Sequence, residues 1–409
     1  MSALALGSIL GWVLVVGAAA ALRSRAYAVF RGISLALHSL IAVAVADGAG
    51  LLWPVFVALH VAVHVHALAL VRPRMRPFLY RALVSIPASF FAAGTLLAFP
   101  WAIVAGLGLD PVGLFVPYVL ALIGVVQSLS ARAEQVDIVV ADGRVAPALA
   151  RQPLGEERVE RPLRIVQISD PHLGPFMSVE RLRRIAERAV RREPDLIVLT
   201  GDFLTMESQS DPELLARAFA PLAALRGRVF ACFGNHDHEA PLTVKGALDR
   251  VGARLLMDQA EVVETAAGRV QVLGVDFAFR NRKAHLARVF AEHPREPGAL
   301  RLVLLHDPGA FAHVPEGGAD LVLSGHTHGG QIGLVSLGLP WTLLRAFVSA
   351  PDHGLWARGP DRLYVHRGTG HYGFPLRLGV PAEESLLVVH APRQASGAAD
   401  GAVSPPSGG

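Results

Sequence analysis

The sequence contains a single cysteine, Cys232, so the chain can form no internal disulfide and no cysteine-based zinc site. Cys232 lies in the apolar run VFACFGNHD, which predicts a buried strand. The sequence also lacks a G-x-S-x-G nucleophile elbow and a P-loop. These absences argue against a serine hydrolase and a P-loop nucleotidase, and the cysteine usage agrees with a reducing compartment.

Charged residues are scarce in the first third of the chain. The whole chain has a hydrophobic fraction of 52% and a mean hydropathy of +0.42, and most of the apolar excess lies in this first third. Five apolar stretches there are long enough, or nearly so, to cross a bilayer: Ala5–Leu22, Phe30–Ala46, Gly50–Val71, Leu83–Leu107 and Val112–Leu129. No basic residue precedes the first stretch, which argues against a cleaved signal peptide. Residues 1–131 are therefore predicted to form a transmembrane region of about five helices.

Arginines are distributed unevenly among the connections between these stretches. The basic connections are the first and the third, which carry Arg23, Arg25, Arg31, Arg72, Arg74, Arg76 and Arg81. The other short loops carry only Asp47 and Asp110. The positive-inside rule places the basic loops in the cytoplasm, and five spans then leave the chain after Leu129 on the same side. The arginines of these cytoplasmic loops thus account for the net charge of +4. We therefore expect no nucleic-acid partner.

Histidines also occur inside the apolar stretches. His60 and His64 are four residues apart, which places both imidazoles on one helical face. Such a pair could hold a haem, a metal or a proton. We favour the alternative, hydrogen bonding between helices.

After residue 131 the pattern changes to short β-rich runs separated by amphipathic helices. Residues 132–163 are predicted to be a linker with the first strands, 164–391 the catalytic domain, and 392–409 a disordered tail rich in Ala, Ser, Gly and Pro. Helices are expected near Val179–Arg192, Glu213–Leu225 and Val244–Val251, and a hairpin turns at Ala267–Gly268. This series predicts a layered α/β domain with more than one sheet.

Five polar clusters stand directly after predicted strands, where the carboxyl edge of a sheet collects loop residues around one crevice. They are Asp170-Pro171-His172, Gly201-Asp202, Gly234-Asn235-His236-Asp237, His306 and Gly325-His326-Thr327-His328. Carboxylates, an amide oxygen and imidazoles in one place are ligands for two borderline divalent cations. A single structural zinc would need only four ligands and would usually use cysteine.

These five blocks, in this order and strand context, resemble the calcineurin-like metallophosphoesterase superfamily over roughly Val136–Ala391. The block SGHTHGGQI, with YVHRGTG and PLRLG, is similar to a membrane-associated bacterial branch that includes phosphodiesterases of lipid-linked substrates. Five attached spans resemble the transmembrane metallophosphoesterase-domain proteins of that branch. The resemblance implies a four-layer α/β/β/α sandwich, joined here to an N-terminal helical bundle in the bacterial inner membrane.

Residue by residue, the resemblance implies that Asp170, His172 and His328 bind one metal, that Asn235, His306 and His326 bind the other, and that Asp202 bridges them. Two such cations can activate a bridging water for in-line attack on phosphorus. The N/O donor set suits Mn, Fe, Zn or Co. His236 is implied as the general acid, with Asp237 orienting or charging it.

This sequence departs from the family pattern after Asp202, where Phe203, Leu204 and Thr205 stand in place of a further acidic residue. The arrangement around Asp202 is therefore open. His238 and His371 lie near the motif loops and either contact substrate or fill the loops.

The resulting hypothesis is a membrane-anchored enzyme that hydrolyses a phosphodiester or pyrophosphate bond by attack of metal-bound hydroxide, with no covalent intermediate. The alternatives are a phosphomonoesterase and a non-catalytic membrane sensor. A lipid-linked substrate is indicated by the apolar segment Ile332–Trp356, which holds Trp341 and Arg345. These side chains either complete the core or face the membrane.

Overall fold

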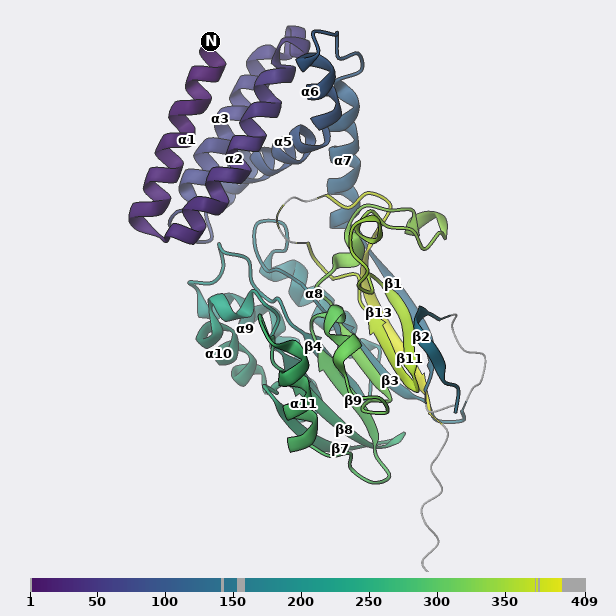
Figure 1. The fold of residues 1–409 in the computed structure, drawn as a ribbon. Coiled ribbons are helices and arrows are strands. Elements are labelled where there is room, and N and C mark those ends of the chain that lie inside the picture. The colour runs from purple at the N-terminus through teal and green to yellow at the C-terminus, as the bar shows by residue number, and fades with distance from the viewer. Residues whose placement is uncertain (1, 141–142, 153–158, 372, 374–375, 392–409) are drawn as a thin grey trace, which may run out of the picture.

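The computed structural model describes residues 2–140, 143–152, 159–371, 373 and 376–391. The chain forms a bundle of helices followed by an α/β domain with two sheets (Figure 1). The predicted disordered tail, 392–409, lies outside the described residues.

Five long helical segments make up the bundle. They are α1 (Ala3–Leu22), α2 (Arg25–Val45), α3 (Trp53–Ala69), a run of α4 (Phe78–Tyr80), η2 (Arg81–Ser85) and α5 (Ile86–Leu97), and α7 (Phe115–Leu129). Short elements, η1 (Ala46–Leu52) and α6 (Phe99–Gly106), connect them. The hydroxyls of Ser2 and Ser24 cap α1 and α2 by accepting hydrogen bonds from backbone amides of the first turn.

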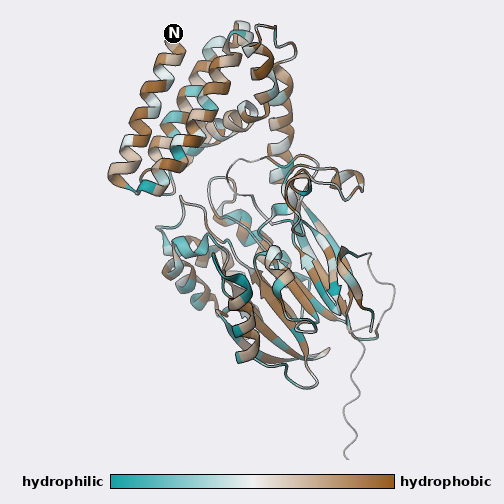
Figure 2. Ribbon diagram, viewed as in Figure 1, coloured by the Kyte–Doolittle hydropathy of each residue, from teal (hydrophilic) through white to brown (hydrophobic). Residues whose placement is uncertain are grey.

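Three helical runs among the described residues are long and apolar enough to cross a membrane: Ala3–Leu22, Arg25–Ala69 and Phe78–Leu97. The second contains two of the predicted apolar stretches, and its chain bends at Gly50, which has φ of 51°. Many large apolar side chains, including Ile33, Leu40 and Leu83, are exposed on the outside of the bundle (Figure 2). Four of the five predicted stretches overlap these runs, whereas Val112–Leu129 corresponds to α7, a shorter apolar helix.

The bundle histidines face one another in its interior. Ser8 Oγ lies 2.8 Å from His60 Nε2, and Ser39 Oγ lies 3.4 Å from His64 Nε2. The ring of His38 stacks on that of His60 with centroids 5.2 Å apart. The two serine contacts support the interpretation that His60 and His64 hydrogen-bond between helices.

The arginine-bearing end of the bundle is the end that faces the α/β domain (Figure 1). Arg23 Nη1 donates to the carbonyl oxygen of Leu70 at 2.7 Å, which joins the end of α1 to the end of α3. Met206, from the α/β domain, packs against the apolar cluster formed there by Ala19, Tyr27 and neighbouring residues. The basic loops and the α/β domain therefore lie on the same side of the bundle.

The two sheets of the α/β domain contain six and seven strands, in the orders β1-β13-β3-β4-β5-β6 and β2-β11-β12-β10-β9-β8-β7. The first holds β1 (Ala131–Val139), β3 (Leu163–Ile168), β4 (Leu196–Thr200), β5 (Val229–Cys232), β6 (Arg254–Leu255) and β13 (Ala382–His390). The second holds β2 (Ala146–Arg151), β7 (Gln259–Thr265), β8 (Gly268–Val275), β9 (Leu300–Leu305), β10 (Leu321–Ser324), β11 (Gly354–Gly359) and β12 (Asp361–Val365).

Three apolar cores stack these sheets into four layers. The central core joins the sheets, with Ile165 and Leu196 on one side and Leu302 and Leu304 on the other. The second core packs the first sheet against α8 (Val179–Arg191), α9 (Pro212–Phe219) and α10 (Pro241–Val251). The third packs the second sheet against α11 (Arg282–Glu292) and η5 (Pro308–His313). The predicted α/β/β/α arrangement is confirmed.

Several local predictions can be compared with these elements. The predicted hairpin is confirmed, since β7 and β8 pair antiparallel with Thr265 opposite Gly268. The segment predicted as a linker with first strands supplies an edge strand to each sheet, and β1 begins two residues after α7 ends. Helix α11 was not predicted. Its sequence, RKAHLARVFAE, buries only Leu286, Val289 and Phe290, so its apolar stripe is narrow.

Candidate metal centre

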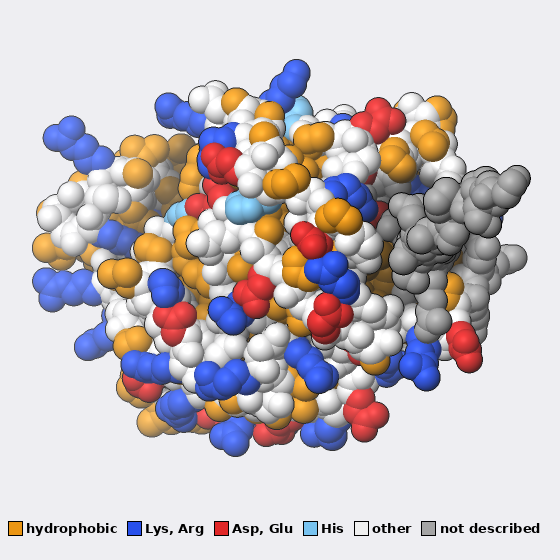
Figure 3. Space-filling model, turned by 90° about the horizontal axis from the view of Figure 1, so that it is seen from below, with side chains coloured by type: hydrophobic (Ala, Val, Ile, Leu, Met, Phe, Trp, Pro, Cys, Tyr) orange, Lys and Arg blue, Asp and Glu red, His pale blue; other side chains and the backbone are white. Residues whose placement is uncertain are grey.

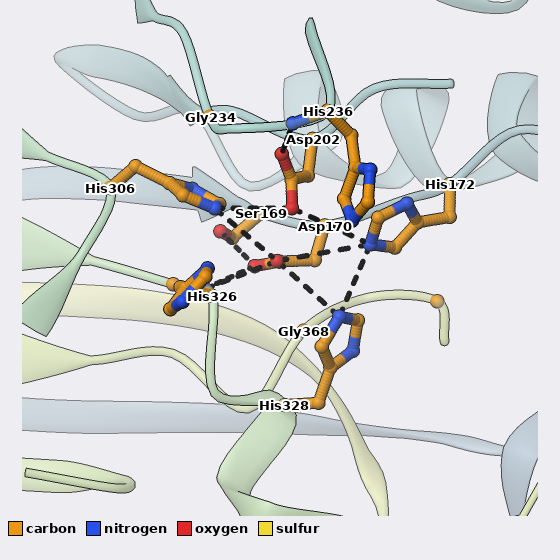
Figure 4. Close-up of polar contacts among 12 residues, drawn as sticks. Ser169, Asp170, His172, Asp202, Gly234, His236, His306, His326, His328 and Gly368 are labelled. Carbon is orange, nitrogen blue, oxygen red and sulfur yellow. Dashed lines mark hydrogen bonds and ion pairs between the residues drawn. The ribbon is translucent and has the colours of Figure 1, made fainter. Parts of the chain in front are cut away.

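The predicted ligands follow strands that run parallel within each sheet. In the first sheet β3, β4 and β5 are parallel neighbours, and in the second β9 and β10 are parallel. Their carboxyl ends bring the following loops together between the two sheets, as Figure 4 shows. The fold therefore gathers the five polar clusters at one place.

The backbone of these loops is unusual. Five of the predicted ligands have positive φ: Asp170 (51°), His172 (43°), Asp202 (57°), His326 (70°) and His328 (51°). Such conformations are uncommon for residues with a side chain and are retained chiefly where the surrounding structure holds them, often at functional sites.

Glycines in the motifs are needed because the loops approach one another closely. A Cβ on Gly234 would lie 2.2 Å from Asp202 Oδ1, and one on Gly325 would lie 1.9 Å from Ser169 Oγ. Any side chain at either position would displace the loop that carries a predicted ligand.

Asp170, His172 and His328 form the first buried group. His328 Nε2 lies 3.4 Å from Asp170 Oδ1 and 3.2 Å from His172 Nε2. Donor atoms that share one cation at about 2.1 Å lie roughly 3 to 3.5 Å apart. These separations fit a shared cation.

Asp202, His306 and His326 form the second group. His306 Nδ1 donates to the carbonyl oxygen of Thr200 at 2.5 Å, which turns Nε2 towards Asp202 Oδ2, 3.2 Å away. Asn235 Oδ1 is buried with no hydrogen-bond partner among the described residues. A buried amide oxygen without a partner is costly, and a cation would satisfy it.

Asp202 faces both groups. Its Oδ2 lies 3.2 Å from His306 Nε2 in the second group and 3.8 Å from His172 Nε2 in the first. Its Oδ1 accepts a hydrogen bond from the backbone amide of His236 at 2.9 Å. This carboxylate occupies the position that a bridge between two cations requires.

Burial and nearby carboxylates shift the pKa values of the imidazoles in opposite directions. Burial lowers the pKa of His172 to about 3 and that of His326 to about 4, so both rings are neutral and able to ligate. Burial would also lower the pKa of His306, but the carboxylates of Asp202 and Asp170 raise it to about 10. The same carboxylates attract a divalent cation.

His236 is oriented by a residue that the sequence did not indicate. His236 Nδ1 lies 2.8 Å from Glu239 Oε1. The predicted orienting partner, Asp237, instead accepts three backbone hydrogen bonds, from Asp202 and Gly234 at Oδ2 and from Phe203 at Oδ1. Of the two roles predicted for Asp237, orientation of His236 is therefore corrected, whereas its charge does help to raise the pKa of His236. Its carboxylate is used to hold the loops after β4 and β5 together.

The open question after Asp202 also receives an answer. Phe203 and Leu204 are buried in the core beside α8 and α9. Asp237 supplies an acidic group next to the Asp202 backbone. After Asp202, where the family pattern has a further acidic residue, this chain thus has apolar side chains that pack in the core. Both ligand groups keep all their residues.

His238 and His371, the two further histidines near the motif loops, have different surroundings. His238 Nε2 lies 3.0 Å from Asp276 Oδ1, and its ring contacts those of Phe233 and Phe279. His371 is buried with its ring 5.0 Å from that of Phe176. His238 thus fills its loop.

Two residues near the ligands were missed by sequence reasoning. The ring of Phe277 lies 5.8 Å from that of His326 and 6.1 Å from that of His306. Arg377 is fully buried and donates to the carbonyl oxygens of His328, Arg367 and Gly370. The PLRLG motif marks Arg377, whereas nothing in the sequence marks Phe277.

Comparison with known proteins agrees with this geometry. The sequence model of the calcineurin-like phosphoesterase family matches residues 163–330. The chain is 29% identical over 233 residues to the phosphodiesterase YaeI of Escherichia coli, a match that covers 55% of this chain and 82% of that protein.

Two further relatives bear on the family and on the bundle. The chain is 31% identical to the uncharacterized metallophosphoesterase YkoQ of Bacillus subtilis, covering 53% of this chain and 80% of YkoQ. It is 29% identical to the zebrafish (Danio rerio) transmembrane protein with metallophosphoesterase domain, covering 56% of this chain and 53% of that protein. The chain spans about half the length of this last relative.

Proposed function

Because the chain belongs to the calcineurin-like phosphoesterase family, we propose that this metallophosphoesterase is a membrane-anchored enzyme with two cations, which hydrolyses a phosphodiester or pyrophosphate bond. The observation that carries the proposal is the position of Asp202. One carboxylate oxygen faces His306 at 3.2 Å and His172 at 3.8 Å, members of the two different ligand groups. A carboxylate oxygen is anionic and has more than one lone pair, so it can contact two cations at once.

The first group would hold one cation and the second, with Asn235, the other, with Asp202 between them. When bound, the cations supply Lewis acidity and an activated water nucleophile. Hydrolysis forms one bond from phosphorus to a water oxygen and breaks one ester or anhydride bond. His236, whose Nδ1 lies 2.8 Å from Glu239 Oε1, would give a proton to the leaving oxygen.

Turnover of bis-p-nitrophenyl phosphate by the full chain with added Mn²⁺ tests the proposal. The Asp202→Asn variant should lose activity, because an amide cannot bridge two cations. The matched control is Asp249→Asn, at an exposed carboxylate paired with Lys245, which should keep wild-type activity. Equal activity of all three proteins would refute the proposal. Faster turnover of p-nitrophenyl phosphate than of the diester would favour a phosphomonoesterase.

Membrane anchoring is the second part of the proposal. Its support is the apolar outer surface of the bundle and the basic end of that bundle beside the catalytic domain. Seen from below, the face turned away from the bundle carries interspersed basic and acidic side chains (Figure 3). An apolar bundle and a charged domain fit bilayer and water respectively.

We also propose that the substrate is lipid-linked, and the segment after the GHTHGG block supports this. Ile332 packs with Ala93 of α5 and Ala121 of α7, so the segment lies against the bundle. Beyond it, Leu337, Leu339, Trp341 and Phe347 are exposed. Trp356 is buried and belongs to the core. The exposed part of the segment suits contact with the bilayer interface.

Leucine substitutions test this contact. A Leu337→Ser and Leu339→Ser double variant should bind liposomes more weakly when expressed as residues 131–391 with a soluble tag, or extract more easily as full chain in mild detergent. Leu242→Ser, at an exposed leucine of α10, is the matched control. If extraction and turnover of a lipid diester are both unchanged, this segment does not contact the membrane surface.

A further inference from the structure

A cavity of about 270 Å³ lies between the helix bundle and the metal centre. Its walls come from α2, α3 and α5 on the bundle side and from the loops after β3 and β4 on the catalytic side. The volume is close to the lower end of the range for ligand pockets, about 300 Å³. Described residues of both the bundle and the α/β domain therefore line this one space.

One end of the cavity reaches the candidate metal centre. His172, a member of the first ligand group, lines it, and so does His371. A molecule that occupies the cavity therefore has one end beside the cations' predicted ligands. A phosphate group at that end would lie at the site of hydrolysis.

The bundle side of the cavity is mostly apolar. Small side chains of α3 and α5, among them Ala67, Ala88 and Ala92, leave the space open. Phe30 and Val63 add larger apolar side chains to this side. The bundle therefore offers an apolar surface to an occupant of the cavity.

The wall of the cavity also holds a guanidinium. Arg31 lines the cavity, and its Nε donates to the hydroxyl of Tyr27 at 2.8 Å, which holds the side chain in place. An arginine at the boundary between an apolar bundle and a charged domain is suited to the phosphate of a lipid.

We propose that this cavity holds the apolar chain of a membrane lipid phosphoester whose phosphate reaches the metal centre past His172. The proposal rests on the proposed function and assigns the tail of the substrate to α2, α3 and α5. Apolar side chains on the bundle side of the cavity, among them Leu35, Val63 and Ala67, would gain from contact with a hydrocarbon chain. A polar substrate would leave the bundle side of the cavity unused.

The test compares three diesters with the same p-nitrophenolate leaving group: bis-p-nitrophenyl phosphate, dibutyryl phosphatidyl-p-nitrophenol and dioleoyl phosphatidyl-p-nitrophenol. Ser89 of α5 lines the cavity, so Ser89→Phe fills it from one wall. Overpacking of a binding space should lower kcat/KM for the dioleoyl ester by about tenfold. The two other esters should change less than twofold.

Ala44→Phe is the matched control, because Ala44 is an exposed residue of α2 and does not line the cavity. It should leave all three rates unchanged. Equal loss on all esters with Ser89→Phe, or no loss on any, would overturn the inference. So would a wild-type protein that cleaves the soluble diester yet shows no preference for the dioleoyl over the dibutyryl ester. Absence of turnover on every ester would refute the proposed function itself.

A binding measurement covers a variant that folds poorly. Cys232 is buried, so Ser89→Cys in the full chain adds one reactive thiol inside the cavity. Dioleoyl phosphatidic acid should slow its maleimide labelling at least several-fold, whereas glycerol phosphate should have no effect. Equal labelling rates with and without the lipid would contradict the proposal.

Discussion

The imidazole of His236 and the carboxylate of Glu239 meet across one turn of η4 (Asp237–Glu239), with Nδ1 and Oε1 2.8 Å apart. Burial by itself would lower the pKa of His236, but the hydrogen bond with Glu239 and the charges of Asp202 and Asp237 raise it above its ordinary value. A protonated imidazole can act as an acid. This contact therefore leads to two predictions of how turnover depends on the pKa of the leaving group.

His236→Ala should keep its metals and lose turnover mainly on esters with poor leaving groups, by about 10²-fold or more. An activated phenolate departs without a proton, so bis-p-nitrophenyl phosphate should be affected much less. The measurement is kcat for a series of diesters of rising leaving-group pKa. A loss that is the same across the series would argue against a general acid.

Glu239→Gln should show a weaker form of the same pattern, because the amide keeps the shape but removes the charge that orients and protonates His236. We expect a loss of about tenfold on the poorest leaving group. Glu213→Gln, at an exposed glutamate paired with Arg250, is the control. If Glu239→Gln lowers all rates equally, Glu239 has only a structural role.

His326→Ala should remove metal and activity together, because it deletes one ligand from a group with few to spare. Metal content by mass spectrometry should fall towards one ion per chain. His285→Ala, at a histidine that pairs with Asp258, should retain the wild-type content. Full metal content in His326→Ala would remove this residue from the ligand set.

Asp237→Asn should destabilise the protein, because one amide group replaces an oxygen that accepts backbone hydrogen bonds. An unsatisfied buried group costs about 1–3 kcal/mol. Thermal unfolding of the solubilised protein, beside the Asp249→Asn control, measures the effect. An unchanged unfolding temperature together with lost catalysis would restore a direct catalytic role to Asp237.

A reporter fused after Arg132 should be cytoplasmic, and one fused near Asp110 should be periplasmic. The basic loops and the catalytic domain lie at the same end of the bundle, so one result fixes both. A fusion near Asp47 should behave as the one near Asp110. Alkaline phosphatase activity from the Arg132 fusion would place the catalytic domain outside.

Much of the fold could be predicted because its patterns are local. Runs such as LRIVQIS and DLIVLTGD combine a buried strand with a polar loop in fewer than ten residues. Strand β11 and helix α11 were not predicted, since their burial depends on neighbours distant in the chain: β2 pairs with β11, and η5 packs beside α11.

The catalytic family, the candidate ligands and the apolar bundle could be read from the chain, because each depends on residue types at fixed positions. The partner of His236 could not, because the spacing of residues along the chain does not say where a carboxylate points: the contact is made by Glu239, not Asp237. The cavity between bundle and metal centre was likewise decided by folding. Its walls come from segments between Phe30 and Gly373, and the space between them exists only once the bundle docks on the catalytic domain.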